Sequence, residues 1–90
     1  MKGTQRTDIG EDWSQLRAGE YCRCKDGWYA RTPNGHFAVL RRHEVREHED
    51  GSVTVSPSIL VQSSRPNDRG VMTPFEVYHS YLERGAWRSV

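Results

Sequence analysis

The chain has no long apolar stretch. Of its 90 residues, 34% are hydrophobic, and the mean hydropathy is −0.86. No segment approaches the roughly 20 apolar residues of a membrane-spanning helix. No apolar segment follows Lys2, as one would in a secretory signal. We therefore expect one small domain with a thin core and no membrane partner.

Cysteine is also scarce, and the common catalytic motifs are missing. Cys22 and Cys24 are the only cysteines. The single residue between them departs from the Cys-x2-Cys spacing of structural zinc sites and rarely permits an unstrained disulfide. The sequence has neither a Gly-x-Ser-x-Gly turn nor a Gly-rich phosphate loop. We expect a non-catalytic protein without a cofactor. Zinc is the second interpretation, and its candidate ligands are Cys22, Cys24, His43 and His79.

An excess of charge of one sign is absent as well. Thirteen Lys and Arg face twelve Asp and Glu, for a net charge of +1. Nucleic-acid-binding domains usually have a basic face and a high pI, so only a local patch would serve. Residues 41–50 hold three arginines but four acids, which favours an ion-pair ladder between strands. Trp28, Tyr29 and Arg31 are typical of a strand face that holds single-stranded nucleic acid, so this alternative stays open.

Turn residues separate short apolar segments along most of the chain. Steps such as Asp26-Gly27, Asn34-Gly35 and Asp50-Gly51 supply the positive φ of tight turns. Residues 41–50 lack the apolar stripe of a helix, so we expect a strand that leads into a hairpin. The sequence predicts a mainly β fold, either a small antiparallel β-sheet or a partly open barrel. The expected strands lie within residues 20–25, 28–31, 36–40, 41–50, 52–56, 59–61, 76–82 and 86–90.

Three segments depart from the strand pattern. Residues 1–10 are polar and glycine-containing, which predicts a flexible N-terminal arm. Residues 11–19 begin with acids and end in glycine, the order of a short N-terminal helix. Residues 62–74 contain Ser, Asn, Asp, Gly and two prolines without periodicity, which predicts a long loop. The expected organisation is a single small β-rich domain over 11–90.

Aromatic residues and arginine are plentiful for a chain of this size. There are three Trp, four Tyr and eleven Arg, the residue types that protein interfaces favour. His79 stands out as a polar ring in an aromatic segment. Together with the 62–74 loop, the candidate partner-binding residues are Trp28, Tyr29, Arg31, His79, Tyr81 and Arg84.

Two segments resemble the motifs of a known family. Residues 50–60 (D-G-S-V-T-V-S-P-S-I-L) and 78–87 (Y-H-S-Y-L-E-R-G-A-W) are similar to a D-G-x-[VI]-T-[VL]-S-P-S-I hairpin followed by H-[GS]-[YF]-[LI]-x-x-G-x-W. This pattern marks small uncharacterised proteins of bacteriophages and of bacterial operons near ubiquitin-like conjugation genes. Some members carry further cysteines that suggest metal binding, and Tyr78 stands where some have Cys, which weakens the zinc interpretation.

The resemblance implies a bacteriophage-associated accessory or structural protein that has no catalytic role. We expect it to bind another protein of the phage or the host, in the cytoplasm of an infected bacterial host or in the virion. The alternative is a zinc-stabilised or nucleic-acid-binding regulatory protein.

Overall fold

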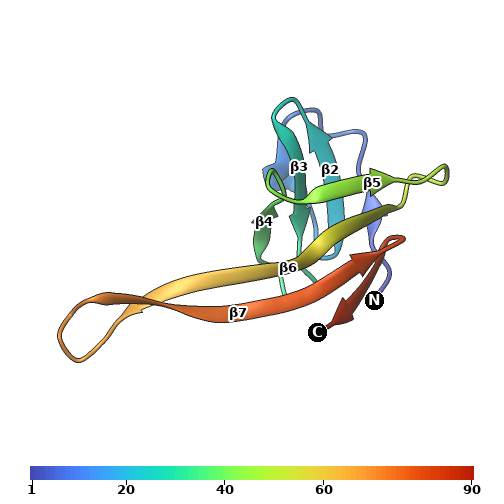
Figure 1. Ribbon diagram of the computed structural model, residues 1–90. Helices are drawn as coiled ribbons and strands as arrows, with labels where there is room; N and C mark the ends of the chain where they lie inside the picture. Colours follow the sequence, from blue (N-terminus) through green and yellow to red (C-terminus); the bar gives the residue numbers. More distant parts are fainter.

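The computed structural model describes residues 1–90 and consists of two four-stranded β-sheets packed against each other. The strand order is β1-β2-β3-β4 in the first sheet and β5-β6-β7-β8 in the second. Strands of the two sheets cross at a steep angle (Figure 1). The elements are β1 (Thr4–Gln5), β2 (Glu20–Cys24), β3 (Gly27–Arg31), β4 (Phe37–Val39), β5 (Glu44–Glu47), β6 (Val53–Pro66), β7 (Met72–Glu83) and β8 (Ala86–Ser89).

The predicted mainly β fold is confirmed, and the sheets do not close into a barrel. All neighbouring strands are antiparallel except β1 and β2. Within the charged stretch 41–50, residues 44–47 form β5, which pairs with β6 from Glu44↔Ser56 to Glu47↔Val53. β4 and β5 do not pair with each other, and between them lies a turn in which the His43 amide donates to the Leu40 carbonyl. The result is two sheets that meet face to face.

The main core lies between the two sheets and takes side chains from both. Val53 and Val55 alternate with exposed or half-exposed neighbours on β6, as expected for a strand with one covered face. Trp87 is buried, and its indole Nε1 donates to the Gly19 carbonyl at 2.9 Å. The turn before it has φ of 47° at Arg84 and 78° at Gly85, the geometry of a tight hairpin turn. The nine core residues are Tyr21, Ala30, Ala38, Leu40, Val53, Val55, Ile59, Leu82 and Trp87.

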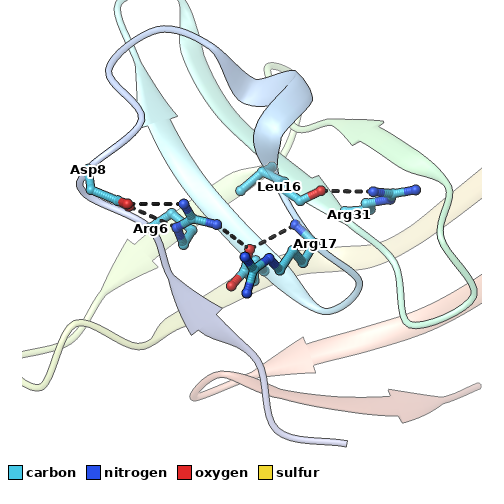
Figure 2. A network of polar contacts seen from close by, with 6 residues as sticks. Arg6, Asp8, Leu16, Arg17 and Arg31 are labelled. Atoms are coloured by element: carbon cyan, nitrogen blue, oxygen red, sulfur yellow. Dashed lines mark hydrogen bonds and ion pairs between the residues drawn. The ribbon is translucent and has the colours of Figure 1, made fainter.

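Residues 1–10 pack against both sheets, so the prediction of a flexible N-terminal arm is wrong. The Gly3 amide donates to the Gly85 carbonyl, and Thr4–Gln5 then pairs with β2. Glycine is required at position 3 because a Cβ there would meet the Gly19 carbonyl oxygen. Figure 2 shows Arg6 reaching Asp8, with Nε to Oδ1 at 2.8 Å. The segment holds the two sheets together because it bonds to both.

The predicted short helix over 11–19 is not present. The segment contains only a 3-10 turn, Trp13–Gln15, which ends at Leu16 in extended geometry (φ −61°, ψ 135°). A nine-residue segment gains too few hydrogen bonds to offset the cost of nucleating an α-helix. The chain instead inserts Leu16 into a second, smaller cluster on the outer face of the first sheet. That cluster consists of Ile9, Leu16, Cys22, Cys24 and Tyr29.

The predicted long loop over 62–74 is also wrong, because β6 runs to Pro66 and β7 begins at Met72. Only residues 67–71 form the turn between them. We call residues 60–79 the projecting hairpin. It extends well beyond the two packed sheets (Figure 1), and the molecule measures 50 × 27 × 21 Å. Its strands were hidden in the sequence because no face of the distal part is buried, so no apolar alternation marks it.

Candidate functional site

The projecting hairpin continues the β6–β7 ladder beyond the core. The last core pair is Ile59↔Ser80, and pairing continues to Pro66↔Met72 at the tip. Register shifts occur between Val55 and Ile59, where Pro57 lies, and between Val61 and Gln62. The first shift agrees with the expectation that Pro57 cannot donate to a regular ladder. From Gln62 to Met72, neither strand pairs with a third strand.

The tip of the hairpin is an ordered turn. The Asn67 side-chain Oδ1 accepts from the amides of Arg69 (2.9 Å) and Val71 (3.0 Å). The Asn67 amide donates to the Val71 carbonyl at 2.9 Å. Gly70 has φ of 75°, which is the left-handed position of a three-residue hairpin loop. Pro66, Asn67 and Gly70 therefore carry a turn signal inside the segment that looks irregular in sequence.

Apolar side chains are exposed along the projecting hairpin. Leu60, Val71 and Met72 are 45%, 57% and 60% exposed. Phe75 is half-exposed and is covered by the Arg65 guanidinium, whose Cζ lies 4.6 Å from the ring centre. An isolated two-stranded hairpin is marginally stable in water. This part of the molecule therefore exposes apolar side chains and has no third strand to support it.

The two free edges of the projecting hairpin differ. Bonded and non-bonded pairs alternate along an antiparallel ladder. Since Asn67 and Val71 are a bonded pair, the main-chain groups of Gln62 and Ser64 point away from β7. By the same alternation, Pro74 occupies an outward position on β7 and has no N–H to offer. Pro66 also points outward, but it is the last residue of β6, so the β6 edge stays open from Leu60 to Ser64, whereas Pro74 interrupts the β7 edge within the strand.

A polar link joins β6 to β7 at the base of the projecting hairpin. The Ser58 hydroxyl lies 2.7 Å from His79 Nε2, and His79 Nδ1 lies 3.4 Å from Glu76 Oε1. The order serine, imidazole, carboxylate also occurs in hydrolases. Here the three groups line none of the grooves of the molecule. The hydrogen bond between Ser58 and His79 connects the two strands, and Glu76 lies beside the His79 ring on β7.

The candidate residues of the first sheet are used largely within the molecule. Trp28 packs against the main core, and Tyr29 is buried in the smaller cluster. The Arg31 guanidinium donates to the carbonyls of Leu16 and Gly35, both at 3.0 Å, and Figure 2 shows the first contact. Trp28 and Tyr29 lie on opposite faces of β3 because they are adjacent in a strand. The structure does not bring these three into one surface.

Tyr29 also carries a charged contact at its hydroxyl. It donates to Asp26 Oδ2 at 2.6 Å, and this bond to a carboxylate raises the pKa of the Tyr29 hydroxyl. The exposed ring nearest to it is Trp13, which stacks on Tyr29 with ring centres 5.1 Å apart. Phe37 meets Trp13 edge-on at 5.4 Å. This small aromatic patch covers the outer face of the first sheet.

The candidate residues of the second sheet lie in three places. His79 is at the base of the projecting hairpin, in the link with Ser58. Tyr81 lies under the Arg88 guanidinium, 4.7 Å from ring centre to Cζ. Arg84 is in the β7–β8 turn and borders a shallow groove of about 530 Å³. No hydrophobic residue lines that groove, unlike most small-molecule sites. Its lining residues are Glu44, Arg46, His48, Thr54, Ser56, Glu83 and Arg84.

The four candidate zinc ligands do not converge. Cys22 and Cys24 lie together in the smaller cluster, with their sulfurs 3.9 Å apart. His43 and His79 instead flank Ser58, through its carbonyl and its hydroxyl. No group of three or more ligand side chains gathers anywhere in the structure. Burial raises the pKa of the Cys22 thiol to about 12, so this sulfur carries its proton at neutral pH.

The sequence predictions included part of the projecting hairpin through the 62–74 segment, which contains Val71 and Met72, and through His79, but they did not include Leu60. Leu60 stands inside the compact run Ile59-Leu60-Val61, where a strand must turn one side chain outward. Val71 and Met72 are an apolar pair in an otherwise polar segment. These were the available signals.

The structure contains no helix with the length and apolar character of a membrane span. Comparison of the chain with models of protein families, with curated proteins and with solved structures finds no match.

Proposed function

We propose that this protein is a non-catalytic module that binds another protein through its projecting hairpin. The observation that carries the proposal is a β-ladder that continues past the core with no third strand and with Leu60, Val71 and Met72 exposed. Ordering such a ribbon costs backbone entropy, and contact with a partner offsets that cost by removing apolar surface from water.

The charge of the projecting hairpin favours a protein partner over nucleic acid. Residues 60–79 contain two arginines, Arg65 and Arg69, and two acids, Asp68 and Glu76. Nucleic-acid affinity comes largely from cations that neutralise phosphates, and this balance gives little of it. A ribbon that is polar, neutral and partly apolar is better suited to a protein surface.

The resemblance to phage proteins gives the proposal its setting. We call the rest of the chain, residues 1–59 and 80–90, the body. A compact body with one projecting hairpin is suited to an accessory or structural role, because the hairpin can reach a neighbouring subunit in a particle or a host factor. The phage association and the location in virion or infected cell stay predictions of the resemblance.

Shortening the projecting hairpin tests the proposal. Replacing residues 62–77 by Asn-Gly would join Val61 to Tyr78 through a two-residue hairpin, and every core residue would be retained. We expect this variant to keep its circular dichroism spectrum and to lose its partner in co-purification from the native host and in sedimentation. Phe37→Ala, which alters exposed apolar surface on the body, is the control and should keep the partner. Retention of the partner by the shortened variant would contradict the proposal.

A further inference from the structure

We propose that the free β6 edge of the projecting hairpin pairs antiparallel with the same edge of a second copy of this chain. The inference rests on the proposed function, because it names the partner that the projecting hairpin binds. Main-chain groups of Gln62 and Ser64 point outward on this edge, and residues 58–65 contain no proline. Two such edges can form an antiparallel ladder centred on Gln62, with Leu60 of each copy opposite Ser64 of the other.

The pairing supplies the strands that each projecting hairpin lacks. Two ribbons joined through their β6 edges form one four-stranded sheet, whereas an isolated two-stranded ribbon is marginal in water. The same patch serves both copies, as a two-fold symmetric interface requires. The β7 edges remain outermost, where Pro74 blocks addition of further strands. The association therefore ends with two copies of the chain.

The charge pattern of the edge favours antiparallel self-pairing. Arg65 is the only charged residue between Ser58 and Arg65. Antiparallel pairing about Gln62 separates the two copies of Arg65 by six residues, or about 20 Å, which is well beyond the Debye length of about 8 Å at physiological salt. Parallel pairing would place them side by side. The charge pattern therefore selects the two-fold arrangement.

The tip of one copy would bring Asp68 close to a basic loop of the other copy. Pairing about Gln62 places Pro66 opposite Ser58, whose carbonyl contacts His43 Nε2 at 3.3 Å. The tip turn then lies beside the Arg42–His43 loop of the second copy. Neither Asp68 nor Arg42 has an ion-pair partner within the chain. Asp68 of each tip is thus placed to pair with Arg42 of the other copy.

Two proline variants test the edge. Ser64→Pro and Met72→Pro each place a second proline opposite an existing one, since the pairs are Ser64↔Pro74 and Pro66↔Met72. Only Ser64→Pro removes a donor from the β6 edge. By sedimentation equilibrium we expect a dimer for the natural chain and for Met72→Pro, and at least a tenfold rise in the dimer dissociation constant for Ser64→Pro. Equal dissociation constants for the two variants would overturn the inference.

A charge exchange gives a second test that leaves the backbone alone. Arg42→Asp and Asp68→Arg should each raise the dimer dissociation constant, and the double variant should return it toward that of the natural chain. Additive weakening in the double variant would overturn the proposed placement of the tip. A natural chain that is monomeric at all concentrations would overturn the self-pairing. In that case, co-purification of a different protein that the shortened variant loses would still support the proposed function.

Discussion

The body of the molecule and the projecting hairpin share the same two strands, yet only the body is covered. At Val55↔Leu82 and Ile59↔Ser80 the side chains of β6 and β7 are buried under the first sheet. Further along the same face of β6, Val61 packs against the core but is only partly buried, and from Gln62 to Pro66 every residue is exposed. Main-chain pairing continues across this boundary, so hydrogen bonds alone do not separate the two regions. The difference is whether a second layer lies over the ladder.

The body and the projecting hairpin differ in the contacts that hold them in place. The body has two clusters of buried side chains, one between the sheets and one under the N-terminal segment. The projecting hairpin has an ordered turn, the Ser58–His79 link and one arginine over Phe75. Apolar side chains removed from water supply most folding free energy. Substitutions in the body should therefore act on folding, and those in the hairpin on binding.

The largest expected effect comes from a matched pair of leucines. Leu82→Ala removes a fully buried side chain from the core and should lower the free energy of unfolding by about 2–5 kcal/mol. Leu60→Ala acts on an exposed side chain of the same ladder and should change it by less than about 0.5 kcal/mol. Urea denaturation in dilute solution, monitored by tryptophan fluorescence, measures both. Similar losses for the two variants would show that the hairpin is part of the folding core.

The fold of the body follows from local signals in the sequence. Val53 and Val55 alternate with polar neighbours because one face of β6 is covered, and Gly85 permits the turn that brings Trp87 back to the core. The distal part of the projecting hairpin gives no such signal because both of its faces are exposed, so its residues are free to be Ser, Gln or Arg. Its strand state depends on pairing between distant residues, which composition does not reveal.

The N-terminal segment was mispredicted for a different reason. Its polar residues form contacts with distant parts of the chain, such as Arg6 with Glu20 and Gly3 with Gly85. Such tertiary contacts override local propensity. Gly3 suggests flexibility in sequence, but the structure uses it for a close approach.

The candidate site was only partly visible in the sequence for a related reason. Aromatic residues and arginine are typical of interfaces, but the same groups also serve inside a small protein. Arg31 is bonded to two carbonyls, and Tyr29 is buried. The exposed apolar residues of the projecting hairpin are ordinary aliphatic side chains, and only the topology shows that nothing covers them.

A smaller effect is expected from a matched pair of glycines. Gly3→Ala would bring a Cβ against the Gly19 carbonyl and within 2.9 Å of Trp87 Nε1, so the N-terminal segment must shift. We expect a loss of about 1–3 kcal/mol in the free energy of unfolding, as for other overpacked sites. At Gly70 an added Cβ would meet no other atom. Gly70→Ala should therefore lower the free energy of unfolding only by the cost of the left-handed φ, about 1 kcal/mol.

Hydrogen exchange would show where each glycine variant acts. Gly3→Ala should speed exchange of the β2 and β8 amides, which the N-terminal segment contacts, while Gly70→Ala should speed exchange only near the hairpin turn. If Gly70→Ala sped hydrogen exchange throughout the body, the body and the projecting hairpin would unfold as one cooperative unit.

The smallest expected effect is a pH dependence of the stability that the N-terminal segment gives to the fold. The Arg6 guanidinium holds the pKa of the Asp8 carboxyl below its ordinary value. A carboxyl whose pKa is lower in the folded state stabilises the fold above its unfolded pKa of about 3.9, and this contribution is lost as the pH falls through the folded pKa. Asp8→Asn should therefore be less stable than the natural chain at neutral pH, and the gap should close as the pH falls below about 4.

Thermal unfolding at a series of pH values measures this gap. Glu49→Gln is the matched control, since Glu49 is an exposed acid of the body without an ion pair, and it should show no gap that closes in this way. High salt should narrow the Asp8→Asn gap at neutral pH, because Asp8 is exposed and its attraction to Arg6 is screened. A gap that persisted in acid would mean that Asp8 acts through its shape and hydrogen bonds. The N-terminal segment would then be held on the body without the charge of Asp8, in part by the buried side chains of Ile9 and Leu16.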